Sequence, residues 1–300
     1  KLFSLNSNHS IAEKIAEAAG LPLGKLSSRQ FSDGEIQINI EESVRGYDIY
    51  IIQSTSFPVN NHLMELLIMV DACKRASANT VTVVMPYFGY ARQDRMAEPN
   101  TPISSKVIAD ILHSVAVNHV ITIDLHSAQT QGFFDMTIEN ITLEKQFADY
   151  IEKNYEKNSF AIASPDAGGV KRARKIADLV HCNDVIIIDK NRYVKNKSKV
   201  MNIIGDPKGK NIIIIDDMID TAGTICHAAT SLKEKGAKQV SVMATHPVFS
   251  GSAYENLGKE DIDKIVVTNT LPIKSELTKV DTIDVSEILA VNIYQIFSHK

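Results

Sequence analysis

The chain has 300 residues, of which 44% are hydrophobic and 23% are charged, and its formal net charge is −4. This length and composition suit a soluble globular protein of two ordinary domains with a sizeable core. The negative balance argues against a nucleic-acid binder held by a broad basic surface, but it leaves room for small anionic ligands in local pockets.

The three cysteines, Cys73, Cys182 and Cys226, are odd in number and lack metal-ligand spacing. Such usage is typical of a reducing compartment. The sequence shows no signal peptide and no long apolar span, so we expect a cytoplasmic protein that does not bind membranes. Because the chain opens at Lys1 and not at Met, we expect a few native residues to precede it.

Strands and helices alternate along the first half of the chain. Apolar runs and period-two patterns predict strands, and apolar residues three and four apart predict helices. The expected strands are 2–5, 36–40, 48–53, 81–85 and 120–124, and the expected helices begin near Ile11 (ending at Gly20), carry Leu63 to Cys73 on one face, and cover 104–116.

The second half repeats this order. Its expected strands are 160–164, 185–189, 212–215, 240–244 and 265–268, with helices over Leu143 to Ile151, after Gly169 and after Thr224. Residues 78–88 align with 237–249, and residues 50–56 align with 214–217. The acidic residues Asp216 and Asp217 have no counterpart in the earlier copy. We therefore expect an internal duplication, while shared architecture alone could mimic such a repeat.

The fold class expected is α/β, with two homologous domains that each hold a mainly parallel sheet flanked by helices. The first domain covers residues 1–140 and the second covers 141–285. The last helix, within 286–300, is expected to fold back onto the first domain.

Residues 211–224 carry the most specific pattern. The β-branched run Ile212–Ile215 predicts a strand buried on both faces, which ends in Asp216 and Asp217. The turn that follows contains Asp220, Thr221, Ala222, Gly223 and Thr224, and a helix starts after it. Backbone N–H groups at a helix start bind phosphate, and carboxylates accept from vicinal sugar hydroxyls or from the waters of magnesium. The simpler alternative makes Asp220 only a helix cap, but two adjacent buried acids favour a ligand site.

A second loop, Asp166, Ala167, Gly168 and Gly169, also joins a strand to a helix. Its glycines allow positive φ and a close backbone approach, which suits an anion, and Asp166 could hold magnesium. Taken alone the loop is an ordinary tight turn. Beside a second phosphate loop it predicts a pyrophosphate site.

Two polar segments follow strands of the first half, where open α/β sheets bind ligands. Arg92 and Gln93 could contact phosphate or a base, or belong to a solvated loop. Asp124, His126 and Asp135 could contact magnesium or phosphate, although a lone histidine is more often structural and magnesium prefers oxygen ligands.

The segment 189–199 is basic, with Lys190 and Arg192 at its start. A solvated charge run is the simple interpretation. The other sites favour a mobile lid that brings cations over a reacting phosphate chain.

Taken together, these motifs resemble the ribose-phosphate pyrophosphokinase family over essentially the whole chain, and the loop at 216–224 resembles the ribose-5-phosphate loop of the type I phosphoribosyltransferase fold. The resemblance implies that ATP is bound by Phe31, Asp33, Gly34, Glu35, Arg92, Gln93 and His126. It implies that His126 and Asp166 serve Mg2+, with Asp124 and Asp135 as further candidates, and that Lys190 and Arg192 are catalytic. Ribose 5-phosphate would be bound by Asp216, Asp217, Asp220 to Thr224 and Arg192.

The implied reaction moves the diphosphoryl group of ATP to the 1-hydroxyl of ribose 5-phosphate and releases AMP. The resemblance further implies a homo-oligomer, a hexamer, in which the turn at 31–35 completes the adenine pocket of a neighbouring subunit. That turn could equally be a plain hairpin.

Two other functions stay open at this point. A salvage phosphoribosyltransferase would use the same 216–224 loop, but it needs neither Arg92 with Gln93 nor Lys190 with Arg192. A regulatory relative without activity should lack one of the catalytic positions, and no such loss is seen in the sequence.

Overall fold

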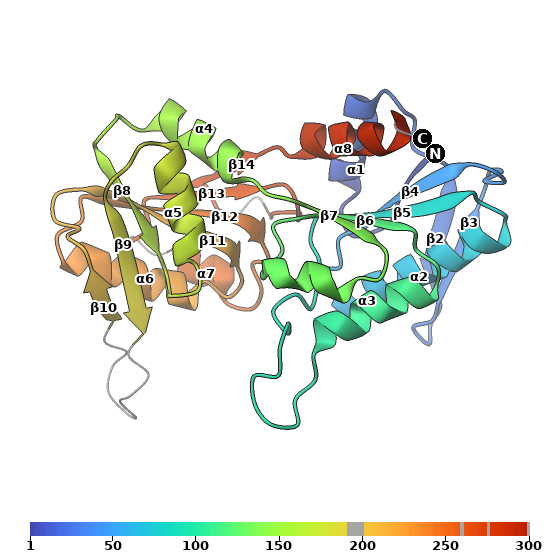
Figure 1. Cartoon of the computed structure of the whole chain (residues 1–300), viewed down its shortest axis with the longest axis horizontal. Helices are drawn as coiled ribbons and strands as arrows, with labels where there is room; N and C mark the ends of the chain where they lie inside the picture. Colours follow the sequence, from blue (N-terminus) through green and yellow to red (C-terminus); the bar gives the residue numbers. More distant parts are fainter. Residues whose placement is uncertain (191–200, 259–260, 275–276, 299–300) are drawn as a thin grey trace. The chain divides into compact units, whose positions relative to one another are not determined.

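The computed structural model describes residues 1–190, 201–258, 261–274 and 277–298 (Figure 1). The chain divides into two compact units, and each is described by itself. Unit 1 comprises Lys1–Ile141, Thr270–Pro272 and Asp284–Lys300, and unit 2 comprises Thr142–Asn269 and Ile273–Ile283. The predicted α/β class with mainly parallel sheets is confirmed.

The sheet of unit 1 has five parallel strands in the order β1-β4-β5-β6-β7. Its strands are rich in β-branched residues, which suit a sheet covered on both faces. Their bounds are β1 Leu2–Ser4, β4 Asp48–Ile52, β5 Thr80–Met85, β6 His119–Ile123 and β7 Thr137–Ile141.

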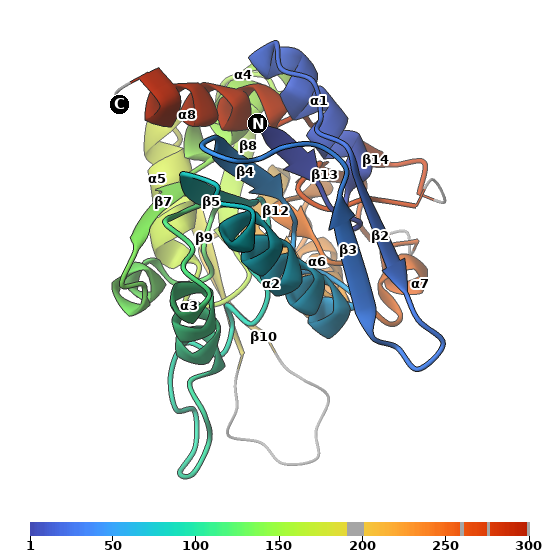
Figure 2. The same cartoon turned by 90° about the vertical axis from the view of Figure 1, so that its right-hand side faces the viewer.

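Helices cover both faces of this sheet, α1 and α8 on one side and α2 and α3 on the other (Figures 1 and 2). The helical segments are α1 His9–Ala19, α2 Val59–Arg75, α3 Ser104–Ser114, the 3-10 turn η1 Ala128–Phe133 and α8 Ser286–Ser298. Side chains of α2 and α3 form one core with alternate residues of the strands, among them Leu66, Leu112 and Ile51.

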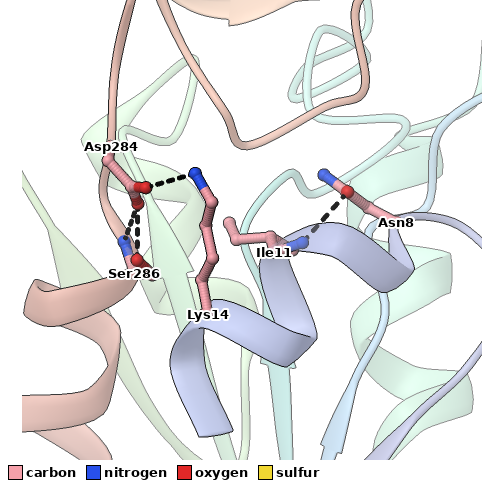
Figure 3. Close-up of polar contacts among 5 residues, drawn as sticks. All are labelled: Asn8, Ile11, Lys14, Asp284 and Ser286. Carbon is pink, nitrogen blue, oxygen red and sulfur yellow. Dashed lines mark hydrogen bonds and ion pairs between the residues drawn. The ribbon is translucent and has the colours of Figure 1, made fainter. Parts of the chain in front are cut away.

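The terminal helix α8 lies beside α1, as Figures 1 and 2 both show. Among its apolar side chains, Leu289, Ala290 and Ile293 are buried. At the start of α8, the Lys14 ammonium lies 2.6 Å from the Asp284 carboxylate, whose other oxygen accepts from the Ser286 amide at 2.9 Å (Figure 3). Helix α1 itself begins with a cap in which Asn8 Oδ1 accepts from the Ile11 amide at 3.3 Å.

Strands β2 (Leu26–Gln30) and β3 (Ile36–Ile40) form a separate antiparallel hairpin, visible as a two-stranded ribbon in Figure 2. The hairpin is tied to α2 by Glu65, which is 2% exposed. Glu65 accepts from Ser28 Oγ at 2.6 Å and from Gln53 Nε2 at 2.6 Å. This buried carboxylate therefore links the hairpin to the end of β4.

The sheet of unit 2 has the order β10-β9-β8-β11-β12-β13-β14, and only the β9–β10 pair is antiparallel. The strands are β8 Phe160–Ser164, β9 Val185–Lys190, β10 Met201–Ile204, β11 Asn211–Ile219, β12 Gln239–Pro247, β13 Lys264–Thr268 and β14 Val280–Ile283.

Successive residues of β11 face opposite cores. Ile213 and Ile215 pack with α4 (Glu144–Asn154) and α5 (Val170–Leu179), whereas Ile212 and Ile214 pack with α6 (Gly223–Glu234) and α7 (Ala253–Leu257). All four isoleucines are fully buried. The prediction of a strand covered on both faces is therefore confirmed.

Several elements differ from the predictions. Strand β11 does not end at Asp216 but continues to Ile219, because β12 pairs with it as far as Pro247. Six elements were not predicted, namely β2, η1, β7, β10, β14 and α7. These are short or weakly apolar, so pairing and packing decide them more than local sequence does. In the part of the chain that the structure describes, no helix is long and apolar enough to span a membrane.

Candidate active site

The two acids of β11 occupy the carboxyl-terminal part of the strand in unit 2. Asp217 is 4% exposed, and its amide donates to Asp216 Oδ1 at 2.8 Å. Burial, and then the negative charge of Asp217, raise the pKa of Asp216 well above its usual range. Such a pair costs free energy unless hydrogen-bond donors or cations lie near it.

Arg172 supplies a positive charge at this place and was not predicted from the sequence. Its Nη1 lies 3.5 Å from Asp217 Oδ1, and its side chain is 20% exposed. The charge of Arg172 opposes the effects that raise the pKa of Asp216. Arg172 stands in the first turn of α5, directly after the loop 166–169, but only the packing of α5 against β11 reveals its role.

The turn after β11 contains a residue in the left-handed conformation that is not a glycine. Its left-handed residue is Ala222, with φ of 62°, and not Gly223. Ala222 is 4% exposed and precedes the first residue of α6, so it occupies the N-cap position without a side-chain cap. Asp220 itself therefore does not occupy the N-cap position of α6. The Asp220 carboxylate instead accepts a hydrogen bond from Ser250 Oγ.

The loop 165–169 is a tight turn before α5. Asp166 Oδ1 accepts from the Gly169 amide at 2.9 Å, and the Asp166 carbonyl accepts from Ser164 Oγ at 2.7 Å. Neither Gly168 nor Gly169 has positive φ, so that part of the prediction is wrong. Gly169 is needed for space, since a Cβ there would lie 2.8 Å from Ser164 Oγ. Ala167 is exposed in the same loop.

In unit 1, the residues 31–35 form the turn of the β2–β3 hairpin. The Phe31 amide donates to the Glu35 carbonyl at 2.7 Å, and the Glu35 amide donates to Asp33 Oδ1 at 3.1 Å. Gly34 has φ of 96°, which the turn requires. The Phe31 side chain is 43% exposed, with the Arg29 guanidinium 5.1 Å from its ring centroid. An aromatic ring thus stands at the tip of a hairpin.

Arg92 and Gln93 lie in the segment that follows β5, and both are exposed. The Gln93 carbonyl accepts from the amide of Ser105 at 3.2 Å and from its hydroxyl at 3.0 Å. These bonds fix the backbone of Gln93 at the first turn of α3.

Asp124 and His126 follow β6 directly. Asp124 is 7% exposed with φ of 40°, and its amide donates to the Ile141 carbonyl at 2.8 Å. His126 is exposed. Asp135 differs from both, because it precedes β7 and has the Lys106 ammonium 3.9 Å from its carboxylate. A cation at that distance competes with a metal ion.

The predicted lid falls mainly on residues 191–200, so Arg192 lies outside the described residues, as does the side chain of Lys190. The backbone of Lys190 ends β9 opposite Met201 of β10. Within the described ranges, no three His, Cys, Asp or Glu side chains gather closely enough to hold a metal by themselves.

Comparisons with known proteins agree over the whole chain. Residues 1–115 match the family described as the N-terminal domain of ribose phosphate pyrophosphokinase, and residues 157–300 match the phosphoribosyl synthetase-associated domain. Ribose-phosphate pyrophosphokinase 1 of Streptococcus pyogenes is 51% identical over 305 residues, a comparison that covers 100% of this chain and 95% of that protein. Ribose-phosphate pyrophosphokinase 2 of Enterococcus faecalis is 50% identical over 303 residues, with 100% and 94% covered.

A solved structure agrees equally well. The phosphoribosylpyrophosphate synthetase from Mycobacterium smegmatis is 36% identical and superimposes with a TM-score of 0.94, covering 100% of this chain and 99% of that chain. The family resemblance deduced from the loops is thereby confirmed. The chain belongs to the ribose-phosphate pyrophosphokinase family.

Proposed function

We propose that this protein transfers the diphosphoryl group of ATP to the 1-hydroxyl of D-ribose 5-phosphate, giving 5-phospho-α-D-ribose 1-diphosphate and AMP for nucleotide biosynthesis. The observation that carries the proposal is the adjacent acids Asp216, which is partly exposed, and Asp217, which is buried, shortly before a left-handed turn and the start of α6. Family membership supports the same reaction.

The chemistry of this loop suits a sugar phosphate. The hydroxyls of ribose would donate to the carboxylates of Asp216 and Asp217, which offsets part of the cost of burying them. The 5-phosphate would be bound by amides of residues 220–224 at the positive end of α6. One end of the ligand would then be held by acceptors and the other by donors, which sets its direction.

ATP would be bound by unit 1 residues, according to the family resemblance. The exposed ring of Phe31 suits stacking against a purine, and Asp33 and Glu35 offer acceptors to its amino group. Arg92 and Gln93 would contact the phosphates or the base, and His126 the phosphates. The loop 166–169 of unit 2 would bind the diphosphoryl group through its backbone.

The transfer itself needs little covalent work from the protein. The 1-hydroxyl attacks the β-phosphorus in line, the bond from that phosphorus to the α-phosphate oxygen breaks, and AMP leaves. Positioning of the two substrates and stabilisation of the developing charge dominate such reactions. Lys190 and Arg192 would supply that stabilisation as cations, and both stay predictions.

Mg2+ is the metal that fits the residues available. Asp166 and Asp124 offer carboxylate oxygens, which Mg2+ prefers, and one or two carboxylates together with substrate phosphates are its usual ligands. His126 suits phosphate better than Mg2+, and Asp135 is disfavoured by Lys106. When bound, Mg2+ would neutralise charge on the phosphates of ATP.

Family resemblance also leads us to propose a cytoplasmic homo-oligomer, a hexamer, in which the turn 31–35 serves a neighbouring subunit. Light scattering checks the assembly. A fully active monomer would contradict it.

The function is tested by incubating the protein with Mg2+, ATP and ribose 5-phosphate. We expect AMP and 5-phospho-α-D-ribose 1-diphosphate in equal amounts. A matched reaction without ribose 5-phosphate should give no AMP. Release of ADP in place of AMP would contradict diphosphoryl transfer, and formation of a nucleotide from 5-phospho-α-D-ribose 1-diphosphate and a free base would indicate a salvage phosphoribosyltransferase.

A further inference from the structure

The segment that follows β12 lies alongside the proposed ribose-5-phosphate loop. Strands β11 and β12 are paired in parallel up to Ile219 and Pro247, so both chains leave the sheet at the same level. Residues 248–256 then run beside residues 219–222. The sequence patterns singled out neither Ser250 nor Asn256 of this later segment.

Backbone hydrogen bonds continue the pairing beyond the strands. The Phe249 amide donates to the Ile219 carbonyl at 2.9 Å, and the Ser250 amide donates to the Asp220 carbonyl at 3.1 Å. Phe249 is 7% exposed, and its ring meets that of Tyr254 edge-on with 5.5 Å between the centroids. The later segment is therefore itself anchored in the core, which makes it a fixed support.

Two side chains of this support reach the loop. Ser250 Oγ donates to Asp220 Oδ1, and Asn256 Nδ2 donates to the Thr221 carbonyl at 3.0 Å. Asn256 is itself held in place. Its Nδ2 also donates to Ser252 Oγ at 3.0 Å, and its main-chain carbonyl accepts from Cys226 Sγ at 3.3 Å. Thus the carbonyls of Ile219, Asp220 and Thr221 each accept a hydrogen bond from the segment 248–256.

Such a support matters because a phosphate loop acts through the directions of its N–H groups and carboxylates. A loop is mobile unless other elements fix it, and functional groups must be held within roughly 0.5 Å of their productive positions. A hydroxyl that donates to one carboxylate oxygen sets the rotation of the whole group.

We propose that Ser250 and Asn256 are positioning residues for ribose 5-phosphate: Ser250 orients the Asp220 carboxylate, and Asn256 holds the backbone of Thr221 before the turn. This inference rests on the proposed function, since it takes the loop 220–224 as the sugar-phosphate site. Neither residue needs to touch the substrate.

The test compares Ser250→Ala, Ser250→Thr and Asn256→Ala with the control Ser159→Ala. Ser159 is also a partly buried serine of unit 2, and it donates to the Glu156 carbonyl at 2.7 Å. Loss of a hydrogen bond to a charged group predicts that Ser250→Ala raises KM for ribose 5-phosphate roughly 10- to 100-fold. Asn256→Ala, which loses a bond to a neutral carbonyl, should raise it about 2- to 10-fold.

The proposal also predicts what stays unchanged. In Ser250→Ala, kcat at saturating ribose 5-phosphate and KM for ATP should remain within about threefold, and Ser250→Thr should restore most of the affinity because it keeps the hydroxyl. An equal rise of both KM values would indicate general damage and overturn the proposal. So would an unchanged KM for ribose 5-phosphate.

A double-mutant cycle with Asp220→Asn sharpens the assignment. If Ser250 acts through Asp220, the two losses in ribose-5-phosphate affinity should not add, and additive losses would contradict the role of Ser250. Calorimetry of ribose 5-phosphate binding separates this proposal from the proposed function. If the wild-type protein binds ribose 5-phosphate but makes no AMP, the proposed function is contradicted, and the affinities of the variants still decide the roles of Ser250 and Asn256. If the wild-type protein does not bind ribose 5-phosphate, both proposals are overturned.

Discussion

The two units are built on one plan and differ at one strand end. The parallel strands β1-β4-β5-β6-β7 of unit 1 correspond in order to β8-β11-β12-β13-β14 of unit 2. A helix follows the first strand of each set, then a hairpin, β2–β3 in one unit and β9–β10 in the other. In the sequence, β9 and β10 flank the predicted catalytic segment as β2 and β3 flank the predicted adenine-binding turn.

The strand ends that correspond are those of β4 and β11. After β4 come Gln53, Ser54 and Thr55, all neutral and at most 2% exposed. Ser54 Oγ donates to the Thr270 carbonyl at 2.9 Å, and Thr55 Oγ1 accepts from the Gly89 amide at 2.7 Å. Gly89 packs so closely that an added Cβ would lie 2.3 Å from the Thr55 carbonyl oxygen.

In unit 1, therefore, protein groups fill and satisfy the place where unit 2 holds Asp216 and Asp217. Neutral residues at this strand end make a closed polar core, whereas carboxylates at the same place gain from further hydrogen-bond donors, which is what the proposed ligand would supply. Two sheets with the same order of strands therefore differ in the chemistry of this strand end without any difference in topology.

The largest effect is expected at the acids of unit 2. Asp217→Ala should weaken ribose 5-phosphate binding by about 100-fold or more, because it removes an acceptor and leaves Arg172 without its partner carboxylate. Calorimetric titration measures this. Arg174→Gln, on the exposed side of the same helix α5, is the matched control and should bind as the wild type does.

The corresponding change in unit 1 should affect stability and leave binding unchanged. Gln53 accepts from the Ser7 amide at 3.0 Å and donates to Glu65 at 2.6 Å. Gln53→Leu should lower the free energy of unfolding by about 2–3 kcal/mol, because it leaves buried polar groups without their partner. Unfolding followed by circular dichroism suits a chain with no tryptophan. Weakened ribose 5-phosphate binding with unchanged stability would refute the comparison.

Asp216→Asn should stabilise the folded protein, and the size of the gain should depend on pH. Because burial and Asp217 raise the pKa of Asp216, the folded state holds this proton more tightly than the unfolded state does. The wild type is therefore stabilised by this group at acid pH and loses that contribution as pH rises through the raised pKa. The variant should be more stable at pH 8 by about 1–2 kcal/mol, with a smaller gain at pH 5. Melting curves at both pH values check the sign; a variant less stable at pH 8 would contradict it.

The smallest effects concern two equivalent ion pairs. Lys14 in α1 and Lys175 in α5 each begin the sequence Lys-Ile-Ala, and each pairs with an acid at the start of a helix, Asp284 before α8 and Glu144 in α4. Burial opposes ionisation of Glu144, but hydrogen bonds from Thr142 and Lys175 outweigh it and lower its pKa.

Lys175→Ala should therefore cost about 1 kcal/mol of stability and Lys14→Ala about 0.5 kcal/mol or less, because Asp284 is 45% exposed and Glu144 only 16%. The Lys175 effect should vanish as pH falls below the ordinary range of a glutamate. Melting temperatures of both variants at pH 7 and at about pH 3 measure the difference, and a larger loss in Lys14→Ala would reverse the ranking.

Local sequence was sufficient for the central strands and for the loops that carry the candidate site. Four consecutive isoleucines at 212–215 left little choice but a buried strand, and the order of acids and small residues after them pointed to a sugar phosphate. Edge elements such as β14 were missed, because Val280–Ile283 has no strong pattern and pairs only with β13.

The supporting residues could not be predicted for a different reason. Ser250 is 30 positions from Asp220, and Arg172 is 45 positions from Asp217, so only the register of β11 with β12 and the packing of α5 bring them together. The left-handed backbone of Ala222 could not be predicted from local sequence either, since an alanine holds that conformation only when its surroundings impose it.

The membership of α8 in unit 1 has a consequence for biosynthesis. All five strands of the unit 1 sheet are complete at Ile141, but the buried residues Leu289, Ala290 and Ile293 of α8, the helix beside α1, are translated only after β14 of unit 2. At about 5–20 residues per second, this interval lasts roughly 7–30 s. The packing of unit 1 is therefore completed only after every strand of unit 2 has been synthesised.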